Sequence, residues 1–189
     1  MAVTPTDIVN QAIQLYGNNQ PPVTGVFPNF DTSVAGVSAK NLYGPCVKTV
    51  MKQFGWDFGR FVGTLVLSGN TAPEPWAYEY IYPADGIEIR QLMPATLADP
   101  NNPSPLNWTI GNALVSSIPT KVIWADEQNA LVVYSNFPPP TVWDDGFREA
   151  VVRLLASEMG MGTAGKTDTA QKLMESAGAF ENAAETRNG

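Results

Sequence analysis

An eight-residue stretch near the carboxyl end of the sequence matches the pattern of a phosphate-binding loop. Residues 160–167 read GMGTAGKT, which fits G-x-x-x-x-G-K-[ST] at every position. In such a loop the backbone amides surround the phosphates, and the lysine, here Lys166, contacts the terminal ones. Taken alone, the pattern predicts a nucleotide hydrolase.

The context of this stretch argues against that chemistry. A phosphate-binding loop follows a buried strand, whereas the preceding residues 147–159, FREAVVRLLASEM, have the spacing and composition of a helix. Residues 122–127, VIWADE, imitate a strand that ends in a magnesium-binding aspartate, but they come before the loop, which reverses the usual order. We therefore interpret residues 160–166 as a glycine-rich connector between two helices, the second of which is capped by Thr167.

A row of aromatic residues alternates along one predicted strand and offers a second kind of chemistry. Such a row can stack sugars or bases, but tyrosines in strands more often pack in a core, and we favour the core interpretation. Carboxylates flank the row, and two of them at the right separation would form a glycosidase acid/base pair. We expect Glu79 to face away from the tyrosines and these carboxylates to be solvated surface groups. The aromatic residues are Trp76, Tyr78, Tyr80 and Tyr82, and the carboxylates are Glu74, Glu79, Asp85 and Glu88.

The composition excludes several classes of enzyme. The chain has no histidine and one cysteine, Cys46, so it lacks the commonest general base and zinc ligand, the histidine-dependent triads and any intrachain disulfide. We expect no metal and no cofactor, and we interpret Cys46 as an inert core residue. With 11 basic and 18 acidic residues the net charge is −7, which disfavours direct binding of nucleic acid. Without a signal peptide or a long apolar run, we expect a soluble product of the cytoplasm.

Helical periodicity is confined to the two ends of the sequence. It predicts helices over residues 4–16 and 38–54, joined by a long loop (17–37) with Phe27 and Phe30 as anchors. A third helix begins at Asp144 or Asp145, and a fourth covers residues 167–184.

The middle of the sequence has the alternation of short strands. We expect a buried strand at 64–67, a hairpin of 76–82 with 87–93, a short strand near Trp108 and Ile110, and a hairpin of 121–125 with 130–135. The predicted fold class is α+β. A helical bundle built from residues 1–62 and 141–189 carries an inserted small antiparallel β domain, residues 63–140.

Four stretches together resemble a known family, the head-to-tail adaptors, or head-completion connectors, of tailed bacteriophages, in particular the tail tubular protein A type. The resemblance covers most of the chain as a pattern of aromatic residues and turns. The stretches are TDIVNQAI (6–13), FGWDFGR (54–60), PWAYEYIYPADGIEIR (75–90) and WDDGFREA (143–150).

The resemblance implies a structural protein of the virion neck, made in the host bacterial cytoplasm, and not an enzyme. About twelve copies would form a ring that binds the portal protein above and a tail or nozzle protein below. Genomic DNA would pass through the channel without specific binding, and an acidic wall suits that passage because it repels phosphates. No cofactor and no membrane are implied.

We expect residues 165–189 to reach the portal, with Leu173 and Phe180 as apolar anchors. The glycine-rich connector would act as a hinge for the last helix, with Lys166 beside it. Phe27 and Phe30 are further candidates for ring or portal contacts. Two alternatives remain from the residues alone: a carbohydrate-binding module that uses the tyrosine row, and a small carboxylate-dependent hydrolase of a virion.

Overall fold

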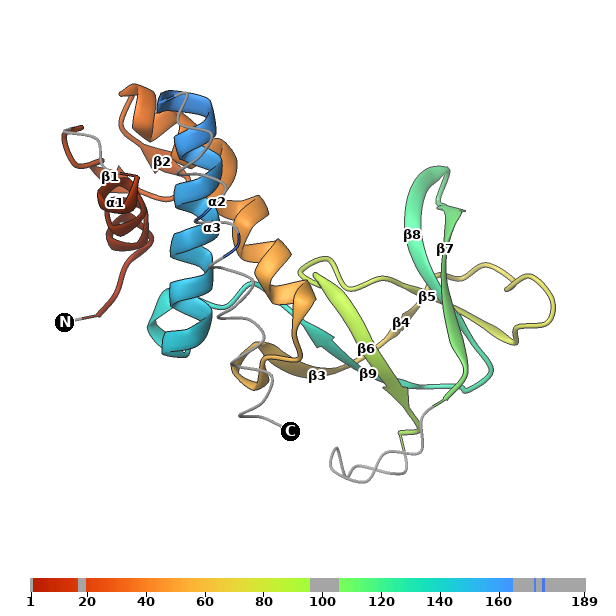
Figure 1. Cartoon of the computed structure of the whole chain (residues 1–189). Coiled ribbons are helices and arrows are strands. Elements are labelled where there is room, and N and C mark those ends of the chain that lie inside the picture. Colours follow the sequence, from red (N-terminus) through yellow and green to blue (C-terminus); the bar gives the residue numbers. More distant parts are fainter. Residues whose placement is uncertain (1, 17–19, 96–105, 165–171, 173–174, 176–189) are drawn as a thin grey trace. The chain divides into compact units, whose positions relative to one another are not determined.

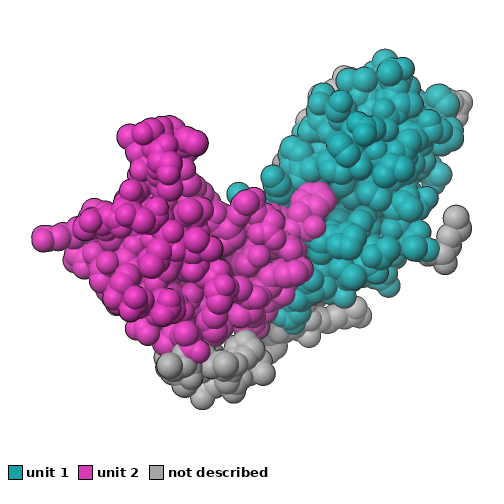
Figure 2. Space-filling model, turned by 180° about the vertical axis from the view of Figure 1, so that it is seen from behind, with its two compact units in different colours: residues 1–58, 138–189 teal, residues 59–137 magenta. Residues whose placement is uncertain are grey.

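The structure is a computed structural model that describes residues 2–16, 20–95, 106–164, 172 and 175. It divides into two compact units, one formed by residues 1–58 with 138–189 and the other by residues 59–137 (Figure 2). Helices occupy the first unit and antiparallel sheets the second, apart from a short hairpin in the first (Figure 1). The chain therefore belongs to the α+β class.

Three α-helices build the described part of the first unit: α1 (Pro5–Leu15), α2 (Val34–Gln53) and α3 (Asp145–Ala164). Helix α1 begins at a capping box, in which Thr4 and Asp7 each bond the other's backbone nitrogen. Helix α3 packs against both α1 and α2, as the sequence periodicity requires of three amphipathic segments. The three helices together bury the side chains of Ile8, Val9, Tyr43, Val47, Leu155 and Met159.

Aromatic rings close one end of this helical core. Trp56 precedes the 3-10 helix η1 (Asp57–Gly59), and its ring centroid lies 5.1 Å from that of Phe147 on α3. Trp143 follows the 3-10 helix η2 (Pro140–Val142), and its ring lies 4.8 Å from Phe147. Both indole nitrogens donate to backbone carbonyls, so these buried rings leave no polar atom unpaired.

The predicted start of α2 was wrong by about one turn. The helix begins at Val34, not at residue 38, because the Ser33 hydroxyl accepts from the backbone nitrogen of Gly36 and caps the helix. The predicted loop also contains a small hairpin, β1 (Gly25–Val26) and β2 (Asn29–Phe30). The Asp31 carboxylate connects the hairpin to the start of α2, since it accepts hydrogen bonds from the backbone nitrogens of Thr24 and Ser33.

Helix α3 confirms one prediction about the glycine-rich stretch and corrects another. A helix, not a strand, leads into Gly160, as expected. The helix does not end there but continues to Ala164, so residues 160–164 are not a connector. Lys166, Thr167 and most of the predicted fourth helix lie outside the described residues.

The second unit contains two antiparallel sheets. The three-stranded sheet has the order β3-β9-β6, formed by Arg60–Thr64, Leu131–Ser135 and Glu88–Met93. The four-stranded sheet has the order β4-β5-β8-β7, formed by Val66–Leu67, Tyr78–Ile81, Ile118–Ala125 and Trp108–Val115. Strands β3 and β4 are separated only by Leu65, so one extended segment passes from the first sheet to the second.

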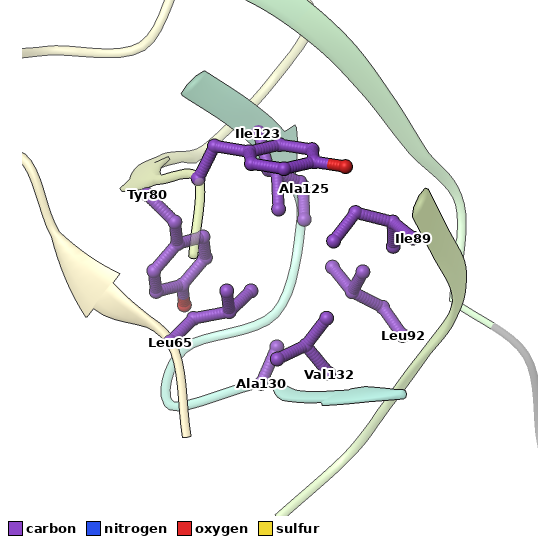
Figure 3. Packing of buried hydrophobic residues seen from close by; sticks show 9 residues of the cluster. Leu65, Tyr80, Ile89, Leu92, Ile123, Ala125, Ala130 and Val132 are labelled. Carbon is purple, nitrogen blue, oxygen red and sulfur yellow. The ribbon is translucent and has the colours of Figure 1, made fainter. Parts of the chain in front are cut away.

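The two sheets share one apolar core, in which side chains from both point toward each other (Figure 3). Tyr80 and Ile123 come from the four-stranded sheet, and Leu92 and Val132 from the three-stranded one; all four are buried. Leu65 lies between the sheets where the chain crosses. In this packing, each strand turns alternate side chains toward the facing sheet.

The structure corrects both predicted hairpins and one strand. Strand β5 pairs with β4 and β8 but not with β6, and β9 pairs with β3 and β6 but not with β8. The chain crosses from one sheet to the other between β5 and β6 and again between β8 and β9, so both sheets contribute strands to the shared core. The true hairpin of this unit joins β7 to β8. The segment predicted as a buried strand, 64–67, buries only Leu65 and exposes Val66 and Leu67.

Candidate functional site

Two residues of the aromatic row lie in the core and two are half-buried. Tyr80 and Tyr82 are buried between the sheets, Tyr78 packs against their cluster, and Trp76 is half-buried. The Tyr80 hydroxyl donates to the backbone carbonyl of Glu127, and the Lys121 ammonium lies 3.6 Å from the centre of the Tyr82 ring. The core interpretation is therefore confirmed for Tyr80 and Tyr82, and these two buried rings offer no stacking surface for a sugar or a base.

Glu79 contradicts the prediction that these carboxylates are solvated. It does face away from the tyrosines, as expected, but its residue is only 3% exposed. Its carboxylate accepts three hydrogen bonds, from Ser68 Oγ at 2.7 Å, Asn70 Nδ2 at 2.8 Å and Trp124 Nε1 at 2.8 Å. The acceptor sites of a buried carboxylate must be filled in this way, because an unpaired buried charge is strongly destabilising.

The surroundings of Glu79 keep it ionised. Burial raises the pKa of its carboxyl, but the hydrogen bonds from Trp124, Ser68 and Asn70 together lower it by more, so the pKa lies below its ordinary value. A general acid at neutral pH needs the opposite shift. We call Glu79 with Ser68, Asn70 and Trp124 the Glu79 cluster. Its hydrogen bonds give it a structural role, which is to stabilise the fold.

The other three carboxylates that flank the aromatic row lie outside the Glu79 cluster. Asp85, in the turn before β6, accepts from the Tyr134 hydroxyl at 3.2 Å. Burial first, and Asp85 second, raise the pKa of that hydroxyl. Glu74 and Glu88 are exposed. Among the described residues, no group of three histidines, cysteines or carboxylates is placed to hold a metal ion.

Cys46 lies on the buried face of α2, as predicted. Burial, with a smaller contribution from the nearby Glu158 charge, raises the pKa of its thiol to about 12. A thiol of that pKa is protonated at neutral pH and is a poor nucleophile or metal ligand.

Asn70 connects the Glu79 cluster to a projecting part of the second unit. Its side-chain nitrogen also donates to the backbone carbonyl of Leu114, at 3.0 Å. Leu114 belongs to the β7–β8 hairpin, whose register is unbroken from Trp108↔Ala125 to Val115↔Ile118. Strand β5 pairs with residues 122–125 of β8 alone, so the far end of the hairpin extends beyond it (Figure 1).

We call residues 112–120, NALVSSIPT, the arm. It forms the projection of the second unit in Figure 2 and contains no charged residue. Leu114 is 64% exposed and Ile118 is 65% exposed. Leu114 pairs with Pro119, whereas Ile118 pairs with Val115 one position further along. Because adjacent positions on a strand face opposite ways, the arm presents apolar side chains on both of its faces.

A second uncharged apolar surface lies on the segment that crosses between the sheets. We call residues 61–67, FVGTLVL, the β3–β4 stripe. Val62 is 52% exposed and Val66 is 64% exposed, and Phe61 and Leu67 are exposed as well. Charged residues or prolines usually protect such edge segments from association, and the stripe has neither.

The predicted contact residues fall into two groups. Phe27 and Phe30 lie on the β1–β2 hairpin and pack on Tyr43 of α2, with ring centroids 4.8 Å and 6.4 Å away. Phe30 is buried, so it anchors the hairpin to its own unit and has little surface for a partner. Lys166, Leu173 and Phe180 lie outside the described residues.

Sequence reasoning missed both the arm and the stripe as surfaces. Two signals were present: each is a run without a charged residue in a chain that has 29 charged residues, and each contains three β-branched residues. Such a run is normally assigned to a core, and only the strand pairing places these two outside it.

No model of a known protein family matches the chain, and no curated protein matches it in sequence. None of the helices in the described residues is both long enough and apolar enough to cross a membrane.

Proposed function

We propose that the protein is a structural subunit that assembles with copies of itself into a ring, as an adaptor between the head and the tail of a bacteriophage virion. One observation supports assembly into an oligomer: the second unit exposes two uncharged apolar surfaces, the arm and the β3–β4 stripe. Exposed apolar surface in strands of this kind is typical of protein–protein interfaces. The resemblance of four sequence stretches to head-to-tail adaptors supplies the biological setting.

The remaining parts of the proposal follow from that setting. The helices form a bundle domain in which the β unit is inserted, the ring has about twelve copies, and its partners are the portal protein and a tail or nozzle protein. The net charge of −7 suits a channel wall that DNA must pass without binding. The residues after 164, including Lys166, Leu173 and Phe180, contact the portal.

The mass of the protein in solution tests the proposal directly. Light scattering after size-exclusion chromatography, from micromolar to millimolar concentration and with portal rings added, is expected to show closed oligomers. Negative-stain images are expected to show rings with a central channel. A chain that remains monomeric under all of these conditions contradicts the proposal.

A deletion separates the portal contact from assembly itself. Without residues 168–189 the subunit is expected to keep its far-ultraviolet circular dichroism spectrum but to lose its binding to portal-bearing heads. Unchanged binding to heads contradicts the proposed portal contact without affecting the ring.

The absence of nucleotide chemistry is tested with a labelled ATP analogue and Mg²⁺. Because α3 leads into Gly160 where a phosphate-binding loop requires a strand, we expect no binding up to millimolar analogue. Micromolar binding that Lys166→Ala abolishes contradicts the proposal and supports a nucleotide-dependent enzyme.

A further inference from the structure

We propose that the arm of each subunit packs against the β3–β4 stripe of a neighbouring copy, and that this heterologous contact, repeated around the ring, is what closes it. This inference rests on the proposed function, because it assigns the surfaces that join the copies.

The geometry of the arm requires a covering partner. A two-stranded ribbon is only marginally stable in water, and this one presents Leu114 and Ile118 on opposite faces. A stripe of a neighbouring copy that lies against the arm would remove one of these apolar faces from water.

The turn at the tip gives a second indication. Ser116 and Ser117 both have positive φ, 50° and 68°. A two-residue hairpin loop normally places Asn-Gly or another glycine-containing pair there, since those residues adopt positive φ at low cost. The arm thus keeps an unfavourable turn, which is typical of segments that an interaction holds in place.

Charge favours a second copy as the occupant. The chain has 18 acidic and 11 basic residues, so two copies repel each other over most of their surfaces. The arm and the stripe contain no charged residue, and they are therefore surfaces that can meet without like-charge repulsion. Both are rich in β-branched and aliphatic side chains of similar size, which suits close packing between strands.

The size of the contact indicates a ring and not a free dimer. A stable interface of standard size uses about 20–30 residues a side, and the arm has nine residues. A single contact of this size is weak. Because the arm and the stripe are different surfaces, each copy can make the contact twice, and a heterologous contact that repeats forms a ring when the rotation between copies closes and an open filament when it does not.

Three variants test the contact. Ile118→Glu in the arm and Val66→Glu in the stripe are expected to raise the concentration for half-maximal ring formation at least tenfold, because each places a charge in an apolar contact. Val34→Glu is the matched control: Val34 is 71% exposed but lies in the first turn of α2, where a carboxylate suits the helix dipole. Unchanged circular dichroism and melting temperature show that each variant is folded.

A cross-linking experiment tests the pairing itself. Chains that carry Ile118→Cys are mixed with chains that carry Val66→Cys, and a mild oxidant is added; Cys46 is buried and stays unmodified. The expected product is a disulfide-linked pair of the two different chains. Cross-links only between two Ile118→Cys chains indicate a contact between arms and overturn the inference.

The outcomes distinguish this inference from the proposed function. If the wild type forms rings and Ile118→Glu and Val66→Glu form them equally well, the arm contact is overturned and the adaptor proposal stands. If the wild type forms no ring, the adaptor proposal fails, and the inference fails with it.

Discussion

Trp124 lies directly opposite Glu79 on the neighbouring strand, and its indole nitrogen donates a 2.8 Å hydrogen bond to the Glu79 carboxylate. The pair lies on the face of the four-stranded sheet that is turned away from the shared core. Asn70 donates to both Glu79 and the backbone carbonyl of Leu114, so the cluster is bonded to the arm itself. Stability of the Glu79 cluster and orientation of the arm are therefore coupled.

Glu79→Gln is expected to lower the free energy of unfolding by about 1–3 kcal/mol, because it removes the charge that three donors share and turns an amide N–H₂ group toward at least one of them. Urea denaturation followed by tryptophan fluorescence measures the change. Glu74→Gln, at an exposed position on the neighbouring loop, is the control and is expected to change the value by less than about 0.5 kcal/mol. Equal free energies of unfolding for the two variants would show that the Glu79 cluster does not stabilise the fold.

Gly111→Ala is expected to destabilise the protein by about 1–3 kcal/mol through overpacking. The Trp124 ring lies across Gly111, and a Cβ there would come within 2.2 Å of the ring. Movement of the ring would also break its hydrogen bond to Glu79. Gly63→Ala is the matched control on β3, since a Cβ at Gly63 would meet its nearest neighbour at 3.7 Å, an ordinary contact. If thermal melting shows the same change for both variants, the packing of Trp124 on Gly111 does not limit stability.

Local sequence signals predicted the elements of this fold better than their partners. The capping box of Thr4 and Asp7 and the three-and-four spacing of α3 are local, and both helices begin within a residue or two of the prediction. Alternation likewise revealed most strands. It did not reveal pairing, because β5 and β6 are consecutive in sequence and yet belong to different sheets.

The Glu79 cluster shows why the candidate site was harder to predict than the fold. Its donors come from a loop nine residues away, at Asn70, and from a strand 45 residues away, at Trp124. No local pattern marks a carboxylate whose partners are that distant. The Ser33 cap of α2 was different: the Asp31-Thr32-Ser33 signal was present in the sequence, and the proline- and glycine-rich residues before it obscured it.

Replacing Ser116-Ser117 by Asn-Gly is expected to stabilise the protein by about 0.5–1 kcal/mol, because these residues tolerate positive φ better than serine. Thermal unfolding of the isolated subunit measures the gain. Asn129→Gly is the control, since Asn129 already has a positive φ of 58° with a residue type suited to it, and we expect a smaller gain there. A loss of stability in the Asn-Gly variant would show that serine at the tip makes stabilising contacts of its own.

Asp31→Asn is expected to destabilise the first unit at neutral pH, by an amount that shrinks as the pH falls toward 2. Hydrogen bonds, the strongest from the Ser33 side chain and the next from the Thr24 backbone, lower the pKa of Asp31 from 3.8 to about 2. A carboxyl whose pKa is lower in the folded than in the unfolded state contributes stability above the unfolded value, and that contribution is lost progressively as the pH falls from about 4 through the folded value of about 2.

Urea midpoints of wild type and Asp31→Asn, measured between pH 7 and pH 2, test this expectation. The two curves are expected to converge as the pH falls through that window. Asp126→Asn, at an exposed position in the β8–β9 loop, serves as the control for the loss of one negative charge. Gly36→Ala should reproduce the defect of Asp31→Asn at pH 7, because a Cβ at Gly36 would come within 2.3 Å of the Asp31 carbonyl oxygen and displace the segment that caps α2. A difference between wild type and Asp31→Asn that stays constant down to pH 2 would mean that the Asp31 charge does not stabilise the start of this helix.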